Sequence, residues 1–253
     1  MNRLDGRVAI VTGAGQGIGH GVALCLARAG AHIVVSEVVQ ERIPRTVADV
    51  EALGVQALGV QGNITRADDV DRLVQETLSR FGKIDILVNN AGIAVIKSMV
   101  EQSEADWDAV LGVNLKGVFL CCHRVVQEMI KQRRGAIVNI ASIAAFHYTV
   151  PHVPYAASKA GVVALTRDLA YEVARFGVRV NAIAPGPIET PLMGSALTPQ
   201  QKEAYARNVP LGRLGQPQDI GEAVAFLVSD AASFITGATL PVSGGTDLRA
   251  ATA

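Results

Sequence analysis

A tyrosine, a lysine and a serine are spaced so that they could carry out acid–base chemistry on a substrate oxygen. Tyr155 and Lys159 are four residues apart, which places them one turn apart on the same face of a helix. An ammonium beside a phenol lowers its pKa, so the tyrosine could exchange a proton near neutral pH. Ser142, thirteen residues before Tyr155, offers a hydroxyl that can hold a carbonyl oxygen. Tyr-x-x-x-Lys alone is a common structural spacing, so its meaning depends on the surrounding motifs.

A glycine-rich segment near the start of the chain could bind the phosphates of a nucleotide. Residues 12–19 lie between a strand expected at 7–11 and a helix expected at 18–29. Glycines let the backbone turn tightly against a pyrophosphate, and the helix N-terminus offers unpaired N–H groups. This context favours a dinucleotide site over a plain packing turn. The residues expected to contact the cofactor are Gly13, Gly15, Gln16, Gly17, Ile18 and Gly19.

An acidic residue, Glu37, ends the second expected strand and follows Gly19 by eighteen residues. At this offset a carboxylate meets the adenosine ribose, accepts its hydroxyls and repels a 2′-phosphate. No lysine or arginine occurs at positions 13–19 or 36–39 to hold that phosphate. These features predict NAD rather than NADP as the cofactor. The alternative is that Glu37 is only a solvated strand end.

Short apolar, β-branched runs alternate with longer segments of helical period, most of them closed by a glycine. This alternation predicts βαβ units and a parallel sheet, that is, a doubly wound α/β fold. Residues 65–68 have the pattern of a capping box, and a helix kink is expected near Gly112. Further strands are expected at 32–36, 56–61, 84–89, 136–141, 178–184 and 238–242, and further helices at 45–53, 65–82, 103–134, 155–176, 199–207 and 217–229. No linker or repeat divides the chain.

Several motifs then occur together in the order and spacing of the short-chain dehydrogenase/reductase family. The chain resembles this family over residues 4–247. The similarity extends to its 3-oxoacyl carrier-protein reductase branch, for example at residues 235–239 and 242–245. Gln16 and Glu37 differ from that NADPH-using branch, which commonly has arginine at the first position. The family motifs are Thr12-Gly-x-x-x-Gly-x-Gly19, Asn89-Asn-Ala-Gly92, Asn114, Ser142, Tyr155-x-x-x-Lys159 and Pro185-Gly186.

The resemblance implies one NAD-binding Rossmann-type domain over residues 1–253, with about seven parallel strands, helices on both faces and a homotetrameric assembly. Tyr155 would exchange a proton with the substrate oxygen, Ser142 would hydrogen-bond that oxygen, and Lys159 would bind the nicotinamide ribose. Asn114 would bend its helix and hold, through its backbone carbonyl, a water that relays protons from Lys159. Residues 186–210 would form a mobile substrate-binding loop and helix. Further implied cofactor contacts are Asn63, Ile64, Asn90, Ala91, Gly92, Pro185, Gly186, Ile188 and Thr190.

Two features of the implied site concern specificity. Asn63 stands where the family usually has aspartate, so it can pair with adenine through its amide but carries no charge. The segments 92–95, 143–153 and 185–207, which would contact the substrate, are mainly apolar, so a small or medium neutral alcohol or ketone is expected. His152 could hydrogen-bond a second substrate oxygen, although a histidine three residues before Tyr155 is more readily a loop residue facing water.

Composition excludes several other classes of protein. The 253 residues contain 23 basic and 23 acidic side chains, so no positive surplus predicts binding to nucleic acid or an anionic membrane. The chain shows neither a signal peptide nor an uninterrupted spanning segment, and its three cysteines lack metal-type spacing. We therefore expect a cytoplasmic protein with reduced cysteines and no metal at the site.

Together these features predict an NAD(H)-dependent oxidoreductase that interconverts a neutral secondary alcohol and a ketone, with Tyr155 as the acid–base group. One alternative is an NADPH-linked 3-oxoacyl thioester reductase, which would need a basic patch for its carrier protein. The candidate cluster for that patch is Arg124, Lys131, Arg133 and Arg134. A non-catalytic dinucleotide-binding protein is the other alternative, but it would not need Ser142, Tyr155 and Lys159 together.

Overall fold

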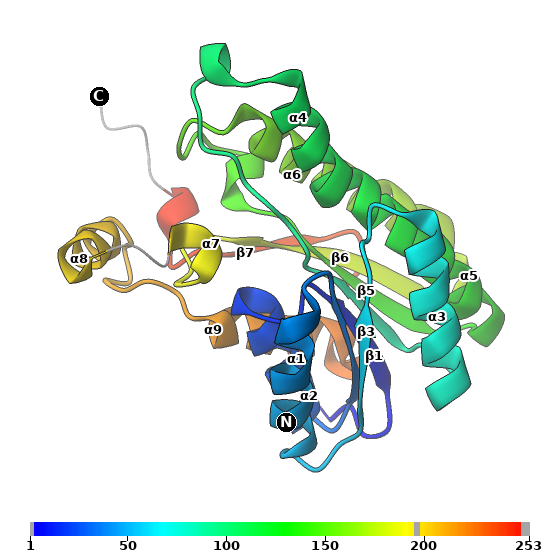
Figure 1. Ribbon diagram of the computed structural model, residues 1–253. Helices are drawn as coiled ribbons and strands as arrows, with labels where there is room; N and C mark the ends of the chain where they lie inside the picture. Colours follow the sequence, from blue (N-terminus) through cyan, green and yellow to red (C-terminus); the bar gives the residue numbers. More distant parts are fainter. Residues whose placement is uncertain (1–2, 195–197, 249–253) are drawn as a thin grey trace.

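Seven parallel strands form one sheet at the centre of the molecule (Figure 1). The computed structural model describes residues 3–194 and 198–248. Neighbouring strands follow the order β3-β2-β1-β4-β5-β6-β7, and every neighbouring pair is parallel. The predicted α/β class and doubly wound parallel sheet are confirmed. The strands are β1 (Val8–Thr12), β2 (His32–Glu37), β3 (Ala57–Gln61), β4 (Ile86–Asn89), β5 (Gly135–Ile140), β6 (Val178–Pro185) and β7 (Thr239–Val242).

Helices cover both faces of the sheet, and each face buries its own apolar core. One face carries α1 (Gly17–Arg28), α2 (Ile43–Glu51) and α9 (Pro217–Val228). The other carries α3 (Ala67–Phe81), α5 (Val118–Gln132) and α6 (Val153–Val173), with α4 (Glu104–Leu111) packed on α6. Successive residues of β1 alternate between the two cores, Ala9 and Val11 in one and Val8 and Ile10 in the other. Burial on both faces explains why this strand is apolar at consecutive positions.

The strand order reverses between β1 and β4, which sets the place of a ligand crevice. The chain runs outward from β1 to β3 in one direction and from β4 to β7 in the other. Loops leaving the carboxyl ends of β1 and β4 therefore diverge, and ligands of open α/β sheets bind at this reversal point. The glycine-rich turn follows β1 and the Asn-Asn-Ala-Gly motif begins at the end of β4, so both lie at this edge.

The expected kink near Gly112 is confirmed as a π-helical turn, Gly112–Gly117, between α4 and α5. The continuous segment Glu104–Gln132 is long and apolar enough, by length and composition alone, to cross a membrane. Val118, Cys122 and Met129 on this segment are nonetheless buried in the core beneath the sheet. Such packing is that of a core helix of an α/β fold.

The prediction of a capping box at residues 65–68 is wrong. The helix α3 begins at Ala67, and its N-cap residue Arg66 makes no capping hydrogen bond. The Thr65 backbone N–H and hydroxyl both donate instead to Asn63 Oδ1, at 3.0 and 2.9 Å. The hydroxyl is therefore used by the turn before the helix. Most other element boundaries lie within two residues of the expected ones.

Two short helices follow β6 and lie off one end of the sheet (Figure 1). They are α7 (Pro191–Gly194) and α8 (Pro199–Arg207), and α8 has the expected bounds. Both fall in the 186–210 segment assigned to substrate binding, of which residues 195–197 lie outside the described part of the chain. The mobility of this segment stays a prediction.

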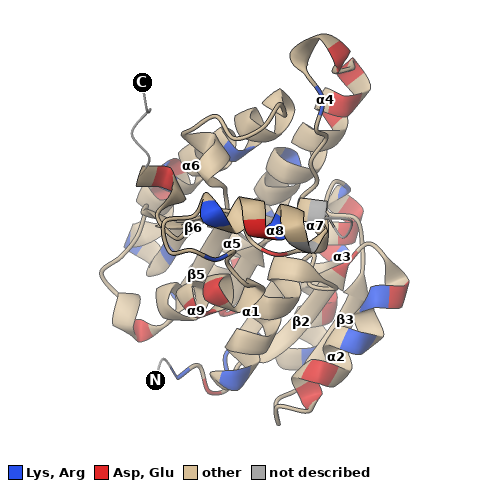
Figure 2. Ribbon diagram, turned by 90° about the vertical axis from the view of Figure 1, so that its left-hand side faces the viewer, with Lys and Arg blue, Asp and Glu red and all other residues tan. Residues whose placement is uncertain are grey.

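Charged and sulfur-bearing side chains agree with the composition. Basic and acidic residues are interspersed on α2, α3 and α8 (Figure 2). Cys25, Cys121 and Cys122 are buried and free, as expected of reduced core residues. Burial raises the pKa of the Cys25 thiol to about 11, which makes it a weak nucleophile at neutral pH.

Candidate active site

The glycine-rich turn leaves the N-terminus of α1 open. Gly13 and Gly17 have φ values of +63° and +55°, a region that side chains disfavour. The helix starts at Gly17, and its N-cap residue Gln16 makes no side-chain hydrogen bond to the first turn. The first-turn N–H groups therefore keep their capacity to bind an anion. This arrangement fits the pyrophosphate of a dinucleotide.

The Glu37 carboxylate is buried at the end of β2 and is bonded to the same turn. Its Oε2 accepts a hydrogen bond from the Gly15 N–H at 3.1 Å, and its Oε1 accepts from Val38 and Val39 N–H groups at 3.0 and 3.1 Å. A Cβ at Gly15 would lie 2.8 Å from Glu37 Oε2, so glycine is required for this approach. The alternative of a solvated strand end is excluded, because Glu37 is only 5% exposed. The carboxylate helps to set the shape of the glycine-rich turn.

The ends of β1 and β4 are joined by hydrogen bonds from Thr12 and Asn90. Thr12 Oγ1 accepts from the Asn90 and Ala91 backbone N–H groups at 3.0 and 3.1 Å. Asn90 Nδ2 donates to the carbonyls of Thr12 and Gly13 at 2.9 and 3.1 Å. Asn90, Ala91 and the glycine-rich turn are thus brought together, as expected. The side-chain amide of Asn90 therefore holds the start of the glycine-rich turn through its hydrogen bonds to two backbone carbonyls.

Ser142, Tyr155 and Lys159 converge at the carboxyl edge of β5. Ser142 follows this strand, and its hydroxyl accepts a hydrogen bond from Ala144 N–H at 3.1 Å. Tyr155 and Lys159 lie on α6, and Lys159 Nζ is 5.6 Å from the centre of the phenol ring. The ammonium donates to the Ile140 carbonyl at 2.7 Å. The expected grouping of the three side chains is therefore present.

The protonation of this group is governed by burial. Burial raises the pKa of Tyr155, and the hydroxyl of Ser142 opposes that rise. The expected net lowering of the phenol's pKa is therefore wrong, because the desolvation of the buried phenol outweighs the effects that lower its pKa. Burial lowers the pKa of Lys159 to about 8. The lysine is thus a cation at neutral pH but loses its proton under mildly alkaline conditions.

Asn114 lies in the π-helical turn and clamps the loop after β4. Its Oδ1 accepts from Ile93 N–H and its Nδ2 donates to the Ile93 carbonyl, both at 2.9 Å. Nδ2 also donates to Ser158 Oγ at 3.2 Å. A Cβ at Gly92 would lie 3.3 Å from Asn114 Oδ1 and 3.7 Å from Lys159 Nζ, so these groups are close neighbours. The bent helix is confirmed, and the water relay through the Asn114 carbonyl stays a prediction.

Three other residues assigned to the cofactor have side chains that are partly or wholly engaged within the protein. The side-chain oxygen Oδ1 of Asn63 already accepts two hydrogen bonds from Thr65, so the side-chain NH2 group is the part suited to adenine. Ile64 is buried against Gly117. Ile188 is buried too, in the core near Gly215, so its backbone rather than its side chain is available to a ligand.

The loop after β6 faces the glycine-rich turn. A Cβ at Gly17 would lie 3.5 Å from Thr190, so the loop after β6 lies against the start of α1. Gly186 donates its N–H to the Val242 carbonyl at 3.0 Å, and Pro185 pairs with Val242 in the sheet register. The loop is therefore anchored at its start to β7, while Thr190 reaches the turn.

Comparison with known proteins agrees with this geometry. A family model described as enoyl-(acyl carrier protein) reductase matches residues 13–247. A 3-oxoacyl-[acyl-carrier-protein] reductase of Thermotoga maritima is 41% identical over 243 residues, which are 96% of this chain and 98% of the relative. The chain belongs to the short-chain dehydrogenase/reductase family. It is thus an oxidoreductase of a family that binds a nicotinamide dinucleotide.

Solved structures of short-chain dehydrogenases/reductases share the whole fold. Levodione reductase superposes with a TM-score of 0.94 at 34% identity, covering 98% of this chain and 100% of its own. The 3-ketoacyl-(acyl-carrier-protein) reductase of Brucella melitensis, complexed with NADH, has a TM-score of 0.91 at 36% identity and covers 96% and 99%. The fold is therefore common to relatives with different names and does not identify the substrate.

Sequence reasoning missed two supporting residues of this short-chain dehydrogenase/reductase site and misjudged a third. Ser158 holds the Asn114 amide, and Thr46 donates its hydroxyl to the Ala14 carbonyl at 3.1 Å beneath the glycine-rich turn. His152 is 7% exposed, so the expectation that it faces water is wrong. Ser158 could have been found as the neighbour of Lys159 in the Tyr-x-x-x-Lys motif, whereas Thr46 gave no sequence signal.

Lys159→Met should stabilise the fold at neutral pH. The folded pKa of Lys159, about 8, lies below its ordinary value of 10.5, so folding buries a cation that the unfolded chain keeps in water. The penalty is full below about pH 8 and disappears as the pH rises to about 10.5. This penalty corresponds to ~3 kcal/mol of unfolding free energy. Because Lys159→Met also loses the hydrogen bond to the Ile140 carbonyl, the net gain in unfolding free energy should be ~2 kcal/mol.

Urea unfolding at pH 7 and at pH 10 measures this gain. We expect most of the advantage of Lys159→Met to be lost at pH 10, and Lys131→Met, on the surface of α5, to show no comparable change. An advantage of the same size at both pH values would contradict the buried charge.

Proposed function

We propose that the chain is an NAD(H)-dependent oxidoreductase that interconverts a neutral secondary alcohol and a ketone. The observation that carries this proposal is the convergence of Ser142, Tyr155 and Lys159 at the same edge of the sheet as the glycine-rich turn. When bound, the nicotinamide accepts a hydride from the alcohol carbon or returns it to the ketone carbon. The protein must then bind the substrate oxygen and move one proton.

The proton step is assigned to Tyr155. In the reducing direction its phenol donates a proton to the oxygen as the carbonyl becomes an alcohol, and in the oxidising direction the phenolate takes that proton back. Ser142 would hydrogen-bond the same oxygen and keep it near the phenol. Lys159, a cation below about pH 8, would bind the nicotinamide ribose and stabilise the phenolate. Asn114 would hold the relay water through its backbone carbonyl.

The preference for NAD is supported by the buried carboxylate at the end of β2. Glu37 is held against Gly15 by its hydrogen bond, so it cannot easily swing away from an incoming 2′-phosphate. Two unit charges about 4 Å apart at an effective dielectric near 20 repel by ~4 kcal/mol, and screening reduces this to ~2–3 kcal/mol. Arg42 competes with this effect, because a Cβ at Gly15 would also lie 2.7 Å from Arg42 Cβ. The NADH complex of the Brucella melitensis relative also supports NAD.

A neutral substrate is supported by the residues around the catalytic group. Segments 92–95 and 143–153 contain no aspartate, glutamate, lysine or arginine. Ile93, Phe146 and Leu192 are large apolar side chains that remain partly exposed. In the loop after β6, Glu189 is paired with Lys202, and this contact holds the pKa of the carboxyl below its usual range. These features suit a ketone without a formal charge.

The second candidate function is reduction of a 3-oxoacyl thioester with NADPH, which the printed name of the Thermotoga maritima relative favours. The basic cluster proposed for its carrier protein is largely neutralised in the structure. Arg124 bonds Asp71 and Glu128, Lys131 bonds Glu128, and Arg134 lies 3.4 Å from Asp230. A panel of neutral ketones and an acetoacetyl thioester, each assayed with NADH and NADPH, separates the two functions. Higher kcat/KM for the thioester with NADPH would overturn the first proposal.

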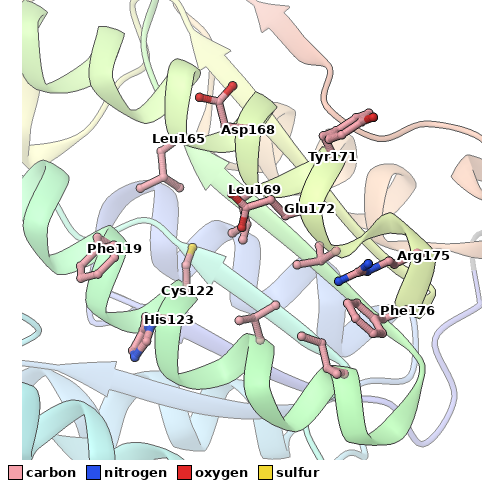
Figure 3. A pocket seen from close by; sticks show the side chains of 13 residues that line it. Phe119, Cys122, His123, Leu165, Asp168, Leu169, Tyr171, Glu172, Arg175 and Phe176 are labelled. Atoms are coloured by element: carbon pink, nitrogen blue, oxygen red, sulfur yellow. The ribbon is translucent and has the colours of Figure 1, made fainter.

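We also propose that the protein is a cytoplasmic homotetramer. A hollow of about 890 Å³ lies between α5 and α6 (Figure 3). Phe119, Leu165 and Leu169 line it, and Phe119 is half exposed. A second copy of the same face would cover these side chains and supply one of the two-fold contacts of the tetramer. Light scattering should give four times the 26.5 kDa of the chain, and the mass of a single chain would contradict the assembly.

Tyr155→Phe should lower turnover by ~10² to 10⁴-fold, the range typical of losing a general acid or base. The ring and its packing are kept, so the reduced cofactor should still bind, as measured by its fluorescence. Tyr171→Phe, which removes the hydroxyl of an exposed tyrosine on the same helix, is the matched control and should leave turnover unchanged. Near-normal turnover of Tyr155→Phe would contradict the proposed proton step.

The wild-type protein should prefer NAD over NADP by about 30- to 150-fold in kcat/KM, from the repulsion of ~2–3 kcal/mol at Glu37. Glu37→Gln keeps the size of the side chain and one of its two acceptor oxygens but removes the charge. It should therefore narrow the preference mainly by improving NADP. Glu41→Gln, on the adjacent exposed turn, is the control. Equal or better wild-type efficiency with NADP would show that Glu37 is not the discriminating residue.

A further inference from the structure

The imidazole of His152 is stacked on the phenol of Tyr155. The two ring centres are 4.9 Å apart and the planes differ by 16°. His152 is the residue just before α6, and Tyr155 lies in the first turn of that helix. The proposed function gives Tyr155 its proton step but assigns no part to this neighbouring ring. Flat stacking restricts the tilt of the phenol, which leaves fewer directions for its oxygen.

The hydrogen-bonding groups of His152 are directed to its own loop. Its Nε2 lies 3.2 Å from Thr149 Oγ1, and the Val150 backbone carbonyl is a second partner of the ring. These contacts occupy groups that a second substrate oxygen would otherwise need. Burial lowers the pKa of His152, so the ring is neutral at neutral pH and adds no charge beside Lys159. These properties suit an immobilised aromatic ring that packs against its neighbour better than they suit a proton donor.

The loop that carries His152 is itself tied to the other wall of the site. The Lys97 backbone N–H donates to the Pro151 carbonyl at 3.0 Å, which joins the loop after β4 to the loop before α6. Lys97 is four residues beyond Ile93, whose backbone Asn114 clamps. The loop that carries the stacked ring is therefore anchored to the loop after β4. A ring held in this way can hold its neighbour.

We propose that His152 is a positioning residue for Tyr155, whose stacked ring fixes the direction in which the phenol oxygen points towards Ser142 and the substrate. This role rests on the proposed function of Tyr155. Proton transfer requires the reacting atoms at hydrogen-bond distance, and a displacement of about 1 Å can cost ~10²-fold in rate. The role should therefore be expressed in kcat rather than in cofactor binding.

Two substitutions separate the ring from its hydrogen bonds. His152→Phe keeps a flat ring and removes both polar contacts, whereas His152→Leu keeps apolar volume and removes the ring. With a simple ketone we expect His152→Phe to retain kcat within about threefold and His152→Leu to lose ~10- to 100-fold. The dissociation constant of the reduced cofactor and the melting temperature should be nearly unchanged in both. If His152→Leu does not fold, His152→Gln replaces it as the variant without a ring.

A double-mutant cycle shows whether His152 acts through Tyr155. In the Tyr155→Phe background the phenol oxygen is absent, so adding His152→Leu should lower kcat no further. An additional loss of the same size as in the wild-type background would overturn the proposal, as would full kcat for His152→Leu or an equal loss for His152→Phe. A loss confined to substrates with a second oxygen would assign His152 to substrate binding instead.

The proposed function and this role can fail separately. If Tyr155→Phe alone keeps near-normal turnover, the proton step is wrong whatever His152 does. If Tyr155→Phe is inactive but His152→Leu is fully active, the proton step stands and only the positioning role is lost.

Discussion

The hydrogen bonds of Thr12 hold together the ends of β1 and β4, the two parallel strands between which the strand order of the sheet reverses. Its hydroxyl oxygen accepts two backbone N–H groups from the segment after β4, while Asn90 returns hydrogen bonds to the segment after β1. Parallel strands have no hairpin to fix their ends, so the loops that leave them would otherwise spread independently. This junction fixes the separation of the loops that follow β1 and β4. The glycine-rich turn and the Ala91–Gly92 segment take their places from it.

Other polar groups of the site are held in the same manner, by backbone atoms rather than by side-chain ion pairs. Glu37 accepts three backbone N–H groups, Lys159 donates to a backbone carbonyl, and Asn114 pairs with both backbone groups of Ile93. Backbone partners cannot change rotamer, so the side chains are oriented before any ligand arrives. The cost is a buried ammonium whose pKa is lowered to about 8. Stability is thus given up where the proposed chemistry needs a charge.

The sequence was sufficient for most of the fold, because its signals are local. Apolar runs with glycine stops predicted every strand of the sheet, and the motif at residues 12–19 placed the turn at its edge. Thr65 was misassigned because its hydroxyl has two competing partners, a helix N–H and Asn63 Oδ1, and sequence alone does not rank them. His152 was expected to face water, because its burial and its stacking on Tyr155 depend on how the loop before α6 folds, and the sequence spacing does not show this. The pKa of Tyr155 was misjudged for a similar reason, since burial is a property of the assembled site.

The π-helical turn Gly112–Gly117 fixes how many residues the chain must have between the Asn114 clamp and the buried face of α5. Each residue of a helix advances the next by about 100° around the axis. Loss of one residue from this turn would rotate Val118, Cys122 and Met129 out of the core, or else carry Asn114 away from Ile93. Substitutions on the outer surface of this segment can be absorbed one at a time, whereas a single deletion would break either the core or the clamp. The segment should therefore accept point changes far more readily than changes of length.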